Sequence, residues 1–237
     1  MTALVINGAT RLIPIIGDPI AQVKSPAGVT HALQQRGVNA VCVPVHVAAD
    51  DVEAFINAAE RVQNIDGIIV TVPHKFAAYR HCSSATDRAH LLGSVQILRR
   101  NADRTWHGDH LDGEGFVAGI RAAGCTPEGR RALLVGAGGA GSAIALALLD
   151  AGVATVAIHD TDARRRDALR AKLAPRYGNA ITAGSSDPTG YTLLVNATPR
   201  GMQVGAAMFE GVNERMVRFL LQTDDRGGEP RNGRTSG

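Results

Sequence analysis

The chain has 237 residues, of which 45% are hydrophobic and only 4% aromatic, and its formal net charge is +3. This length allows one large domain or two small ones, and small aliphatic core residues suit α/β layers better than an aromatic-rich β-sandwich. Basic residues are scattered among acids, without the concentrated positive stripe that nucleic acid or an anionic membrane needs. We therefore expect no nucleic-acid partner and no membrane partner.

The three cysteines, Cys42, Cys82 and Cys125, are widely spaced and form no Cys-x-x-Cys pair. Such a set argues against a disulfide framework and a structural zinc site, so we interpret all three as small buried or half-buried residues. The sequence starts without a basic stretch followed by an apolar run, and no segment approaches roughly eighteen consecutive apolar residues. These features predict a cytoplasmic protein, and no metal is implied.

In the first half, apolar runs alternate with helical periodicities, which predicts a repeated βα pattern and a mostly parallel sheet. Leu98 and Trp106-His107 flank a polar turn, which predicts an antiparallel pair, and Gly124 ends a helix over 112–123. The elements expected before them are strand 12–16, helix 25–36, strand 40–47, helix 50–62 and strand 67–72.

A second βα series is expected in the other half, with only about three clear strands. A last helix is expected over 214–221, and residues 223–237, rich in Gly, Arg and acids, are expected to be disordered. The elements of the series are strand 132–135, helix 142–151, strand 155–159, helix 163–173 and strand 192–196.

A glycine-rich segment follows directly on the strand at 132–135 and opens an alanine-rich helix. Strand, glycine turn and helix in this order are typical of dinucleotide binding, because glycines allow the tight turn and the approach of pyrophosphate to backbone N–H groups. We therefore expect a nicotinamide dinucleotide, NAD or NADP, to bind at Gly136, Ala137, Gly138, Gly139, Ala140 and Gly141.

Asp160 ends the next strand, about twenty residues beyond the glycines. A carboxylate here accepts hydrogen bonds from the ribose hydroxyls and repels a 2′-phosphate, which favours NAD. Arg164, Arg165 and Arg166 follow, and they either form a solvated first helical turn or pair with a 2′-phosphate. NADP, with Arg164 as a ligand, therefore stays open beside NAD.

Four further segments are unusual in composition and position: Gly17–Pro26, Ile69–Lys75, His110–Phe116 and Asn196–Met202. Together with the glycine turn, they resemble five signatures of the shikimate dehydrogenase family, in the family's order, over roughly residues 10 to 202. The resemblance covers most of the chain.

The resemblance implies a two-domain α/β fold with a cleft between the domains. A substrate domain would occupy 1–124, a Rossmann-type NAD(P) domain 125–202, and a helix over about 206–222 would pack back on the first. It implies reversible hydride transfer between nicotinamide and 3-dehydroshikimate, shikimate or a quinate-like hydroxy acid, as in chorismate and aromatic amino acid biosynthesis. The partner would thus be a small-molecule substrate, and a homodimer is left open.

Lys75 and Asp112 are the candidate catalytic pair. Hydride delivery to a carbonyl carbon builds negative charge on its oxygen, so an acid must donate a proton, and Lys75 can do so. Asp112, at a helix N-terminus that stabilises a carboxylate, would orient the substrate hydroxyl and hold the ammonium. Singly, such residues are more often a solvated lysine and a helix cap; only their joint place in two matching motifs favours catalysis.

The resemblance assigns the remaining contacts. Substrate would be bound by Ser25, Thr71 and Gln96, and the loop beside the nicotinamide would contribute Ala197, Thr198 and Met202. We expect His74 to face solvent.

Several recognition positions depart from the family pattern. Val23 replaces a serine, Ile69 and Gln96 each replace an asparagine, and His110-Leu111 replaces asparagine-threonine. Losing a donor at Val23 or Ile69 would cost about 1–3 kcal/mol each in an unsatisfied substrate oxygen. We therefore expect an altered preference among shikimate-like hydroxy acids.

A larger departure follows Met202, where Gln203–Glu210 already resembles the start of the family's closing helix. A βα segment of roughly thirty residues is therefore expected to be missing. The family's substrate-contacting glutamine on that helix would align near Val212.

Three functions stay open on these grounds. The retained Lys75 and Asp112 favour a dehydrogenase of shikimate or quinate. The changes at recognition positions leave two alternatives: a dinucleotide-binding paralogue without turnover, or a dehydrogenase for an amino or deoxy analogue of shikimate.

Overall fold

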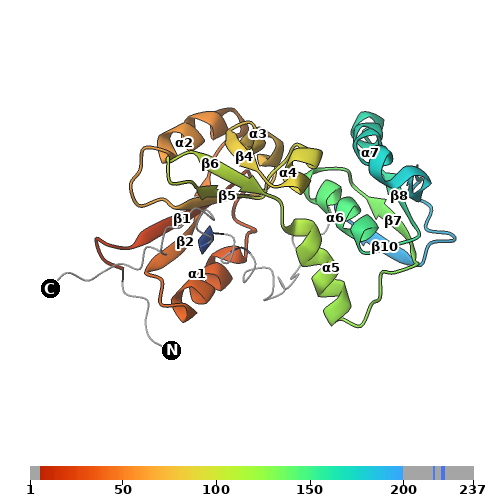
Figure 1. Cartoon of the computed structure of the whole chain (residues 1–237), viewed down its shortest axis with the longest axis horizontal. Coiled ribbons are helices and arrows are strands. Elements are labelled where there is room, and N and C mark those ends of the chain that lie inside the picture. Colours follow the sequence, from red (N-terminus) through yellow and green to blue (C-terminus); the bar gives the residue numbers. More distant parts are fainter. Residues whose placement is uncertain (1–5, 200–215, 217–219, 222–237) are drawn as a thin grey trace. The chain divides into compact units, whose positions relative to one another are not determined.

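The computed structural model describes residues 6–199, 216 and 220–221. These residues fall into two compact units, each built on one sheet (Figure 1). The first contains the described chain up to Thr86 together with Ser94–Asp109, and the second contains Asp87–Gly93 and the chain from His110 to 199. The division into domains at 124 and their roles stay predictions.

The first sheet has the strand order β2-β1-β3-β5-β6-β4. β1 is parallel to both β2 and β3, so the carboxyl ends of these three strands lie at one edge. β5 is antiparallel to β3 and β6, and β4 is parallel to β6. The strands are β1 Arg11–Gly17, β2 Ala40–His46, β3 Gly67–Val70, β4 Cys82–Ala85, β5 Ile97–Arg100 and β6 Trp106–Asp109.

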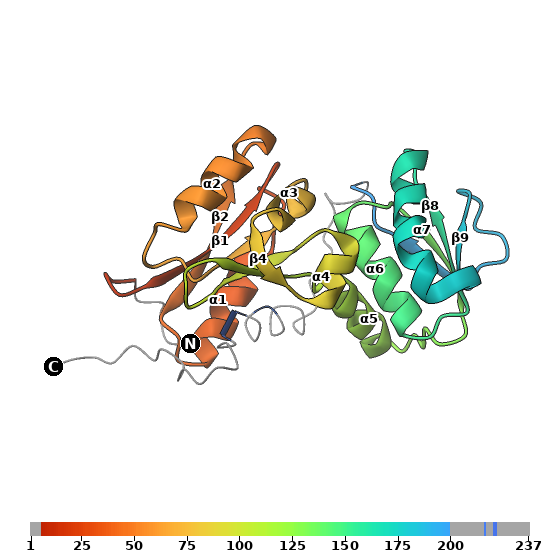
Figure 2. The ribbon, with the colours of Figure 1, turned by 45° about the horizontal axis from the view of Figure 1, so that its top comes forward.

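Helices cover both faces of this sheet. α1 lies on one face, and α2 and α3 lie on the other (Figures 1 and 2). α2 buries Val52, Ile56 and Ala59, a spacing that places all three on one side of a helix. The elements are α1 Ser25–Gln35, the 3-10 turn Ala49–Asp51, α2 Val52–Ala59 and α3 Lys75–Tyr79.

The second sheet is entirely parallel, in the order β10-β7-β8-β9. This is the strand order of the first four strands of a doubly wound nucleotide-binding sheet. The strands are β7 Arg131–Val135, β8 Thr155–His159, β9 Ile181–Ala183 and β10 Leu193–Asn196. The helices of this unit are α4 Asp87–Leu92, α5 Asp112–Ala122, α6 Gly139–Asp150 and α7 Ala163–Tyr177, with a 3-10 turn at Gly178–Ala180.

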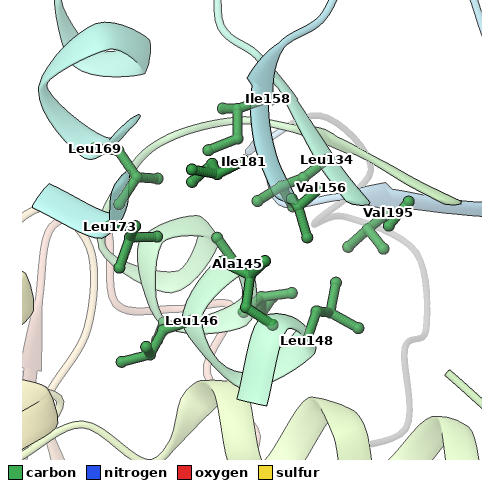
Figure 3. Packing of buried hydrophobic residues seen from close by; sticks show 14 of the residues in the cluster. Leu134, Ala145, Leu146, Leu148, Val156, Ile158, Leu169, Leu173, Ile181 and Val195 are labelled. Atoms are coloured by element: carbon green, nitrogen blue, oxygen red, sulfur yellow. The ribbon is translucent and has the colours of Figure 1, made fainter. Parts of the chain in front are cut away.

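The core of the second unit lies between α6, α7 and the sheet (Figure 3). α6 is buried on nearly all sides because α5 packs on it opposite the sheet. The contact needs glycine: a Cβ at Gly113 of α5 would overlap the carbonyl group of Ala143. Side chains that fill this core include Leu134, Ala145, Leu148, Val156, Ile158, Leu169, Leu173 and Val195.

The α/β class and most predicted elements are confirmed, and the antiparallel pair forms with Leu98 opposite Gly108. The prediction of three strands in the second series is wrong, because β9 adds a fourth. β9 has three residues, too few to show a period. α3, α4 and β4 were not predicted either. α2 is shorter than expected, because a 3-10 turn precedes it and the helix already ends at Ala59.

Some expectations fall on residues beyond the described ones. Met216, Leu220 and Leu221 are helical, but the rest of the helix expected over 214–221 lies outside the described residues. The tail expected at 223–237 and the position after Met202, where a βα segment is expected to be missing, also lie outside the described residues.

The three cysteines are buried or half-buried, as expected: Cys42 is buried, and Cys82 and Cys125 are half-buried. Burial raises the pKa of Cys42 and of Cys82 to about 12. Both thiols are therefore protonated at neutral pH and poor nucleophiles.

Arg100, the last residue of β5, holds the carboxyl end of α2. Its guanidinium donates to the carbonyl oxygens of Ala59, Glu60 and Ile65 at 2.6 to 2.8 Å. It also lies over the Trp106 ring, 4.6 Å from the centroid. The last carbonyls of a helix lack intrahelical partners, so this planar set of donors satisfies groups that α2 leaves open.

Arg100→Met should therefore lower the free energy of unfolding by about 2 kcal/mol, because several carbonyls lose a charged donor and the cation–π contact is lost. Urea unfolding followed by circular dichroism measures this. Arg61→Met is the matched control, because Arg61 is exposed beside the same helix end, and it should stay within about 0.5 kcal/mol. Equal losses in both variants would contradict the capping role.

Candidate functional site

The carboxyl ends of β1, β2 and β3 carry the candidate substrate residues of the first unit. Gly17 lies opposite His46 in the β1–β2 register, and Ile16 lies opposite Val70. The Thr71 N–H donates to the Ile16 carbonyl at 2.9 Å, so the chain leaves β3 directly beside the end of β1. Ligands of parallel sheets bind at this edge, where the connecting loops meet.

Gly17 permits a close approach of the two strand ends. A Cβ here would overlap the Thr71 methyl group and lie 3.0 Å from the Val72 carbonyl oxygen. The Asp18 N–H donates to that same oxygen at 3.0 Å. Glycine at 17 is therefore what allows half-buried Thr71 to occupy its place beside the loop at 17–26.

Lys75 is the first residue of α3 and is only 8% exposed. Lysine is seldom this deeply buried in proteins, so its place at the carboxyl edge of a sheet indicates function. The Val95 N–H donates to the Lys75 carbonyl at 3.0 Å, which joins α3 to the segment before β5. That segment also carries Gln96.

Ser25 and Gln96 are both buried, at 5% and 4% exposure. Ser25 is the first residue of α1, with proline in the first turn, so it lies among the open N–H groups of a helix N-terminus. The backbone carbonyl of Gln96 accepts the Val70 N–H at 2.6 Å. The side-chain amide nitrogen of Gln96 lies 4.0 Å from the Met216 sulfur. The first unit thus holds all three predicted substrate ligands and Lys75.

The glycine turn lies in the second unit, between β7 and α6. Gly136 has φ +106°, and a Cβ on it would meet the Ala197 carbonyl at 2.9 Å and the Thr198 nitrogen at 3.1 Å. The Ala197 N–H donates to the Val135 carbonyl at 2.8 Å. The structure thus brings the glycine turn and the loop after β10 together, although they lie far apart in sequence.

Gly138 differs from Gly136 in its surroundings. It precedes α6 with an ordinary φ of −74°, no side chain caps the helix there, and a Cβ would meet nothing within 4 Å. The N–H groups at the start of α6 are open donors that favour negative charge. These residues fit the pyrophosphate of a dinucleotide.

Asp160 follows β8 and lies beside the turn. Its carboxylate accepts the Ala137 N–H at 2.7 Å and the Asp162 N–H at 2.8 Å. A carboxylate has about four acceptor positions, so two remain for the hydroxyls of a ribose. Asp160 is therefore part of the turn, and its selection of the nucleotide stays a prediction.

The arginines after Asp160 have carboxylate neighbours of their own. Asp162 caps α7 by accepting the Arg164 N–H at 3.0 Å, and it lies 3.8 Å from the Arg164 guanidinium and 3.6 Å from that of Arg165. Arg166 makes two hydrogen bonds of 2.9 Å with Asp167, which lower the pKa of that carboxyl. This supports the solvated first turn over a phosphate site.

Asp112 is the first residue of α5 and is half-buried. It belongs to the second unit, because α5 packs on α6, whereas Lys75 belongs to the first. Lys75 and Asp112 are each described within their own unit, so their action as a catalytic pair stays a prediction. Met202 lies outside the described residues.

His74 is the residue that sequence reasoning missed. It was expected to face solvent, but it is 1% exposed, and its Nε2 lies 2.7 Å from the Val47 carbonyl oxygen. Its position between a strand-ending proline and Lys75 was the available signal.

Among residues 6–199, 216 and 220–221, no group of three or more His, Cys, Asp or Glu side chains could hold a metal ion. No helix there is long and apolar enough to span a bilayer.

Comparison with known proteins identifies the family. The model of the shikimate dehydrogenase substrate binding domain matches residues 15–98. A shikimate dehydrogenase (NADP(+)) of Roseobacter denitrificans is 36% identical over 220 residues, which are 90% of this chain and 77% of that protein. The chain belongs to the shikimate dehydrogenase family.

Solved structures with the same fold include two informative relatives. The shikimate dehydrogenase of Thermus thermophilus, in complex with NADP(H) and shikimate, is 28% identical with a TM-score of 0.69, covering 79% of this chain and 68% of that one. A ligand-free 5-ketofructose reductase of a Gluconobacter species is also 28% identical, with a TM-score of 0.67, covering 80% and 69%. The two-domain fold with a Rossmann-type half is thereby confirmed.

The two glycines of the turn should respond differently to alanine. Gly136→Ala should lower the free energy of unfolding by about 2 kcal/mol or more, because a Cβ meets backbone at a positive φ. Gly138→Ala should change it by less than about 0.5 kcal/mol, yet weaken NAD binding about tenfold, because the methyl group occupies the approach of the pyrophosphate. Thermal unfolding and fluorescence titration with NAD measure the two effects; unchanged NAD affinity in Gly138→Ala would contradict the binding site.

Proposed function

We propose that the chain is an NAD(P)-dependent dehydrogenase that interconverts 3-dehydroshikimate and shikimate, or a quinate-like hydroxy acid. The observation that carries the proposal is a nearly buried lysine, Lys75, at the carboxyl edge of the first sheet, beside Thr71 and Gln96. The name of the Roseobacter relative supports the reaction. On this proposal the reaction belongs to aromatic amino acid biosynthesis.

Lys75 is proposed to move the proton. The nicotinamide supplies the hydride in reduction and accepts it in oxidation. As the carbonyl oxygen gains negative charge, the Lys75 ammonium donates its proton to that oxygen, and it takes the proton back when the hydroxyl is oxidised. Asp112 would orient the same hydroxyl, with its charge favoured by the first turn of α5.

Substrate binding is proposed for Ser25, Thr71 and Gln96. Ser25 offers a hydroxyl at a helix start suited to the substrate carboxylate, and Thr71 offers one at the strand end. A cytoplasmic location and a homodimer also stay predictions, to be checked by cell fractionation and light scattering.

Turnover should depend on Lys75. In an assay of nicotinamide absorbance with shikimate and quinate, Lys75→Ala should lower kcat about a hundredfold or more, because the general acid is removed. Lys172→Ala is the control, because Lys172 lies on α7 and donates to the Leu92 carbonyl. No turnover in the native protein would contradict the proposed reaction and favour the binding-only paralogue if NAD still binds.

The cofactor is proposed to be NAD, although the Roseobacter relative is named for NADP(+). Asp160→Asn should raise the ratio of kcat/KM for NADP to that for NAD about tenfold, because the amide keeps a hydrogen-bond acceptor while the charge that repels a 2′-phosphate is lost. Asp150→Asn is the control, because Asp150 lies at the opposite end of α6 and should leave the ratio unchanged. A native preference for NADP would overturn the assignment.

A second candidate is the same chemistry on a different carbonyl compound. Ile69 is 1% exposed and lies opposite Ile15 and Ile97, so an apolar side chain fills a position where the family has asparagine. The Gluconobacter relative is named for a keto sugar. Two additions to the assay decide between substrates: 5-ketofructose, reduced beside dehydroshikimate, and deoxy and amino analogues of shikimate, oxidised beside shikimate. Faster turnover of any of them than of its reference compound would favour this candidate.

A further inference from the structure

The buried imidazole of His74 is not used by the proton transfer proposed above. It occupies the N-cap position of α3, one residue before Lys75, and is 1% exposed. A polar ring buried to this extent needs a hydrogen-bonding partner.

The partner is Val47, the residue that follows β2. The His74 Nε2 lies 2.7 Å from the Val47 carbonyl oxygen, and since a carbonyl only accepts, Nε2 carries the hydrogen. The Val47 N–H in turn donates to the Gly17 carbonyl at 3.2 Å. His74 therefore joins the start of α3 to β2 and, through β2, to the end of β1.

The backbone around His74 is fixed by further bonds. The His74 N–H donates to the Thr71 carbonyl at 3.0 Å, and its own carbonyl accepts the Ala78 N–H at 2.8 Å. The Lys75 carbonyl accepts the Val95 N–H at 3.0 Å. The turn that carries Lys75 is thus attached on two sides, to β2 through His74 and to the segment before β5 through Val95.

α3 has only five residues, and a helix this short does not hold its own orientation. No side-chain hydrogen bond caps it. Where the Lys75 ammonium lies therefore depends on the attachments of its first turn. A shift of about 1 Å in a reacting group can cost a hundredfold in rate.

We propose that His74 is a positioning residue for Lys75, holding the first turn of α3 against the end of β2 so that the ammonium meets the substrate oxygen. This inference rests on the proposed function. It assigns no proton transfer to His74 itself.

Three variants test it. His74→Phe fills the same space without a donor. His74→Gln places an amide N–H near the former Nε2 and can still donate to Val47. The double variant His74→Phe with Lys75→Ala shows whether His74 acts through the lysine, because groups that act as one unit are not additive.

In steady-state kinetics, His74→Phe should lower kcat about ten- to a hundredfold with little change in the KM for NAD. His74→Gln should restore most of kcat. In the Lys75→Ala background, His74→Phe should add less than about a twofold effect. A full multiplication of the two losses, or no rescue by His74→Gln, would overturn the proposal and leave His74 a purely structural residue.

A second readout does not need turnover. The chain has three lysines, and Lys24 and Lys172 are exposed where Lys75 is not. Under limited acetylation followed by mass spectrometry, His74→Phe should raise labelling of Lys75 several-fold relative to Lys24 and Lys172, and His74→Gln should not. If the native protein is inactive, the proposed function fails, and unchanged Lys75 labelling would then also reject the role of His74.

Discussion

Parallel pairing of β1 with β2 and β3 is the constraint on which the substrate side depends. It requires three carboxyl ends to lie at one edge, and every residue assigned to substrate chemistry in the first unit follows one of these ends or a segment bonded to them. The approach is close enough that Gly17 has no room for a side chain. The function proposed for this unit therefore depends on the strand geometry that places these side chains.

The second unit uses the same device with different contacts. β10 returns beside β7, so the loop at Ala197 reaches the glycine turn and presses on Gly136. Asp160 then fixes the turn from the end of β8 by accepting the Ala137 N–H. A nucleotide would meet a surface already held by three strands, which lowers the ordering needed on binding.

Much of this could be predicted from sequence because the signals are local. A strand followed by Gly136–Gly141 and a helix predicts a dinucleotide-binding fold by itself. The predicted bounds of β8 agree with the structure at both ends. The strands β4 and β9 were not predicted because they are short and carry few apolar residues. Their pairing partners are strands distant in sequence. The burial of His74 was not predicted because Val47 lies 27 residues away in sequence, and the only local signal was the position of His74 between Pro73 and Lys75. Lys75 and Asp112 fall in different units, so only their motifs pair them.

The packing of α5 and α4 has a consequence for dissecting the chain. Val117 of α5 and Leu92 of α4 belong to the same buried cluster as α6, although both precede the dinucleotide half in sequence. A recombinant fragment beginning at 125 would lack both, and the apolar side of α6 would face water. Such a fragment would self-associate, and a soluble cofactor-binding piece has to include α4 and α5, both of which belong to the second unit.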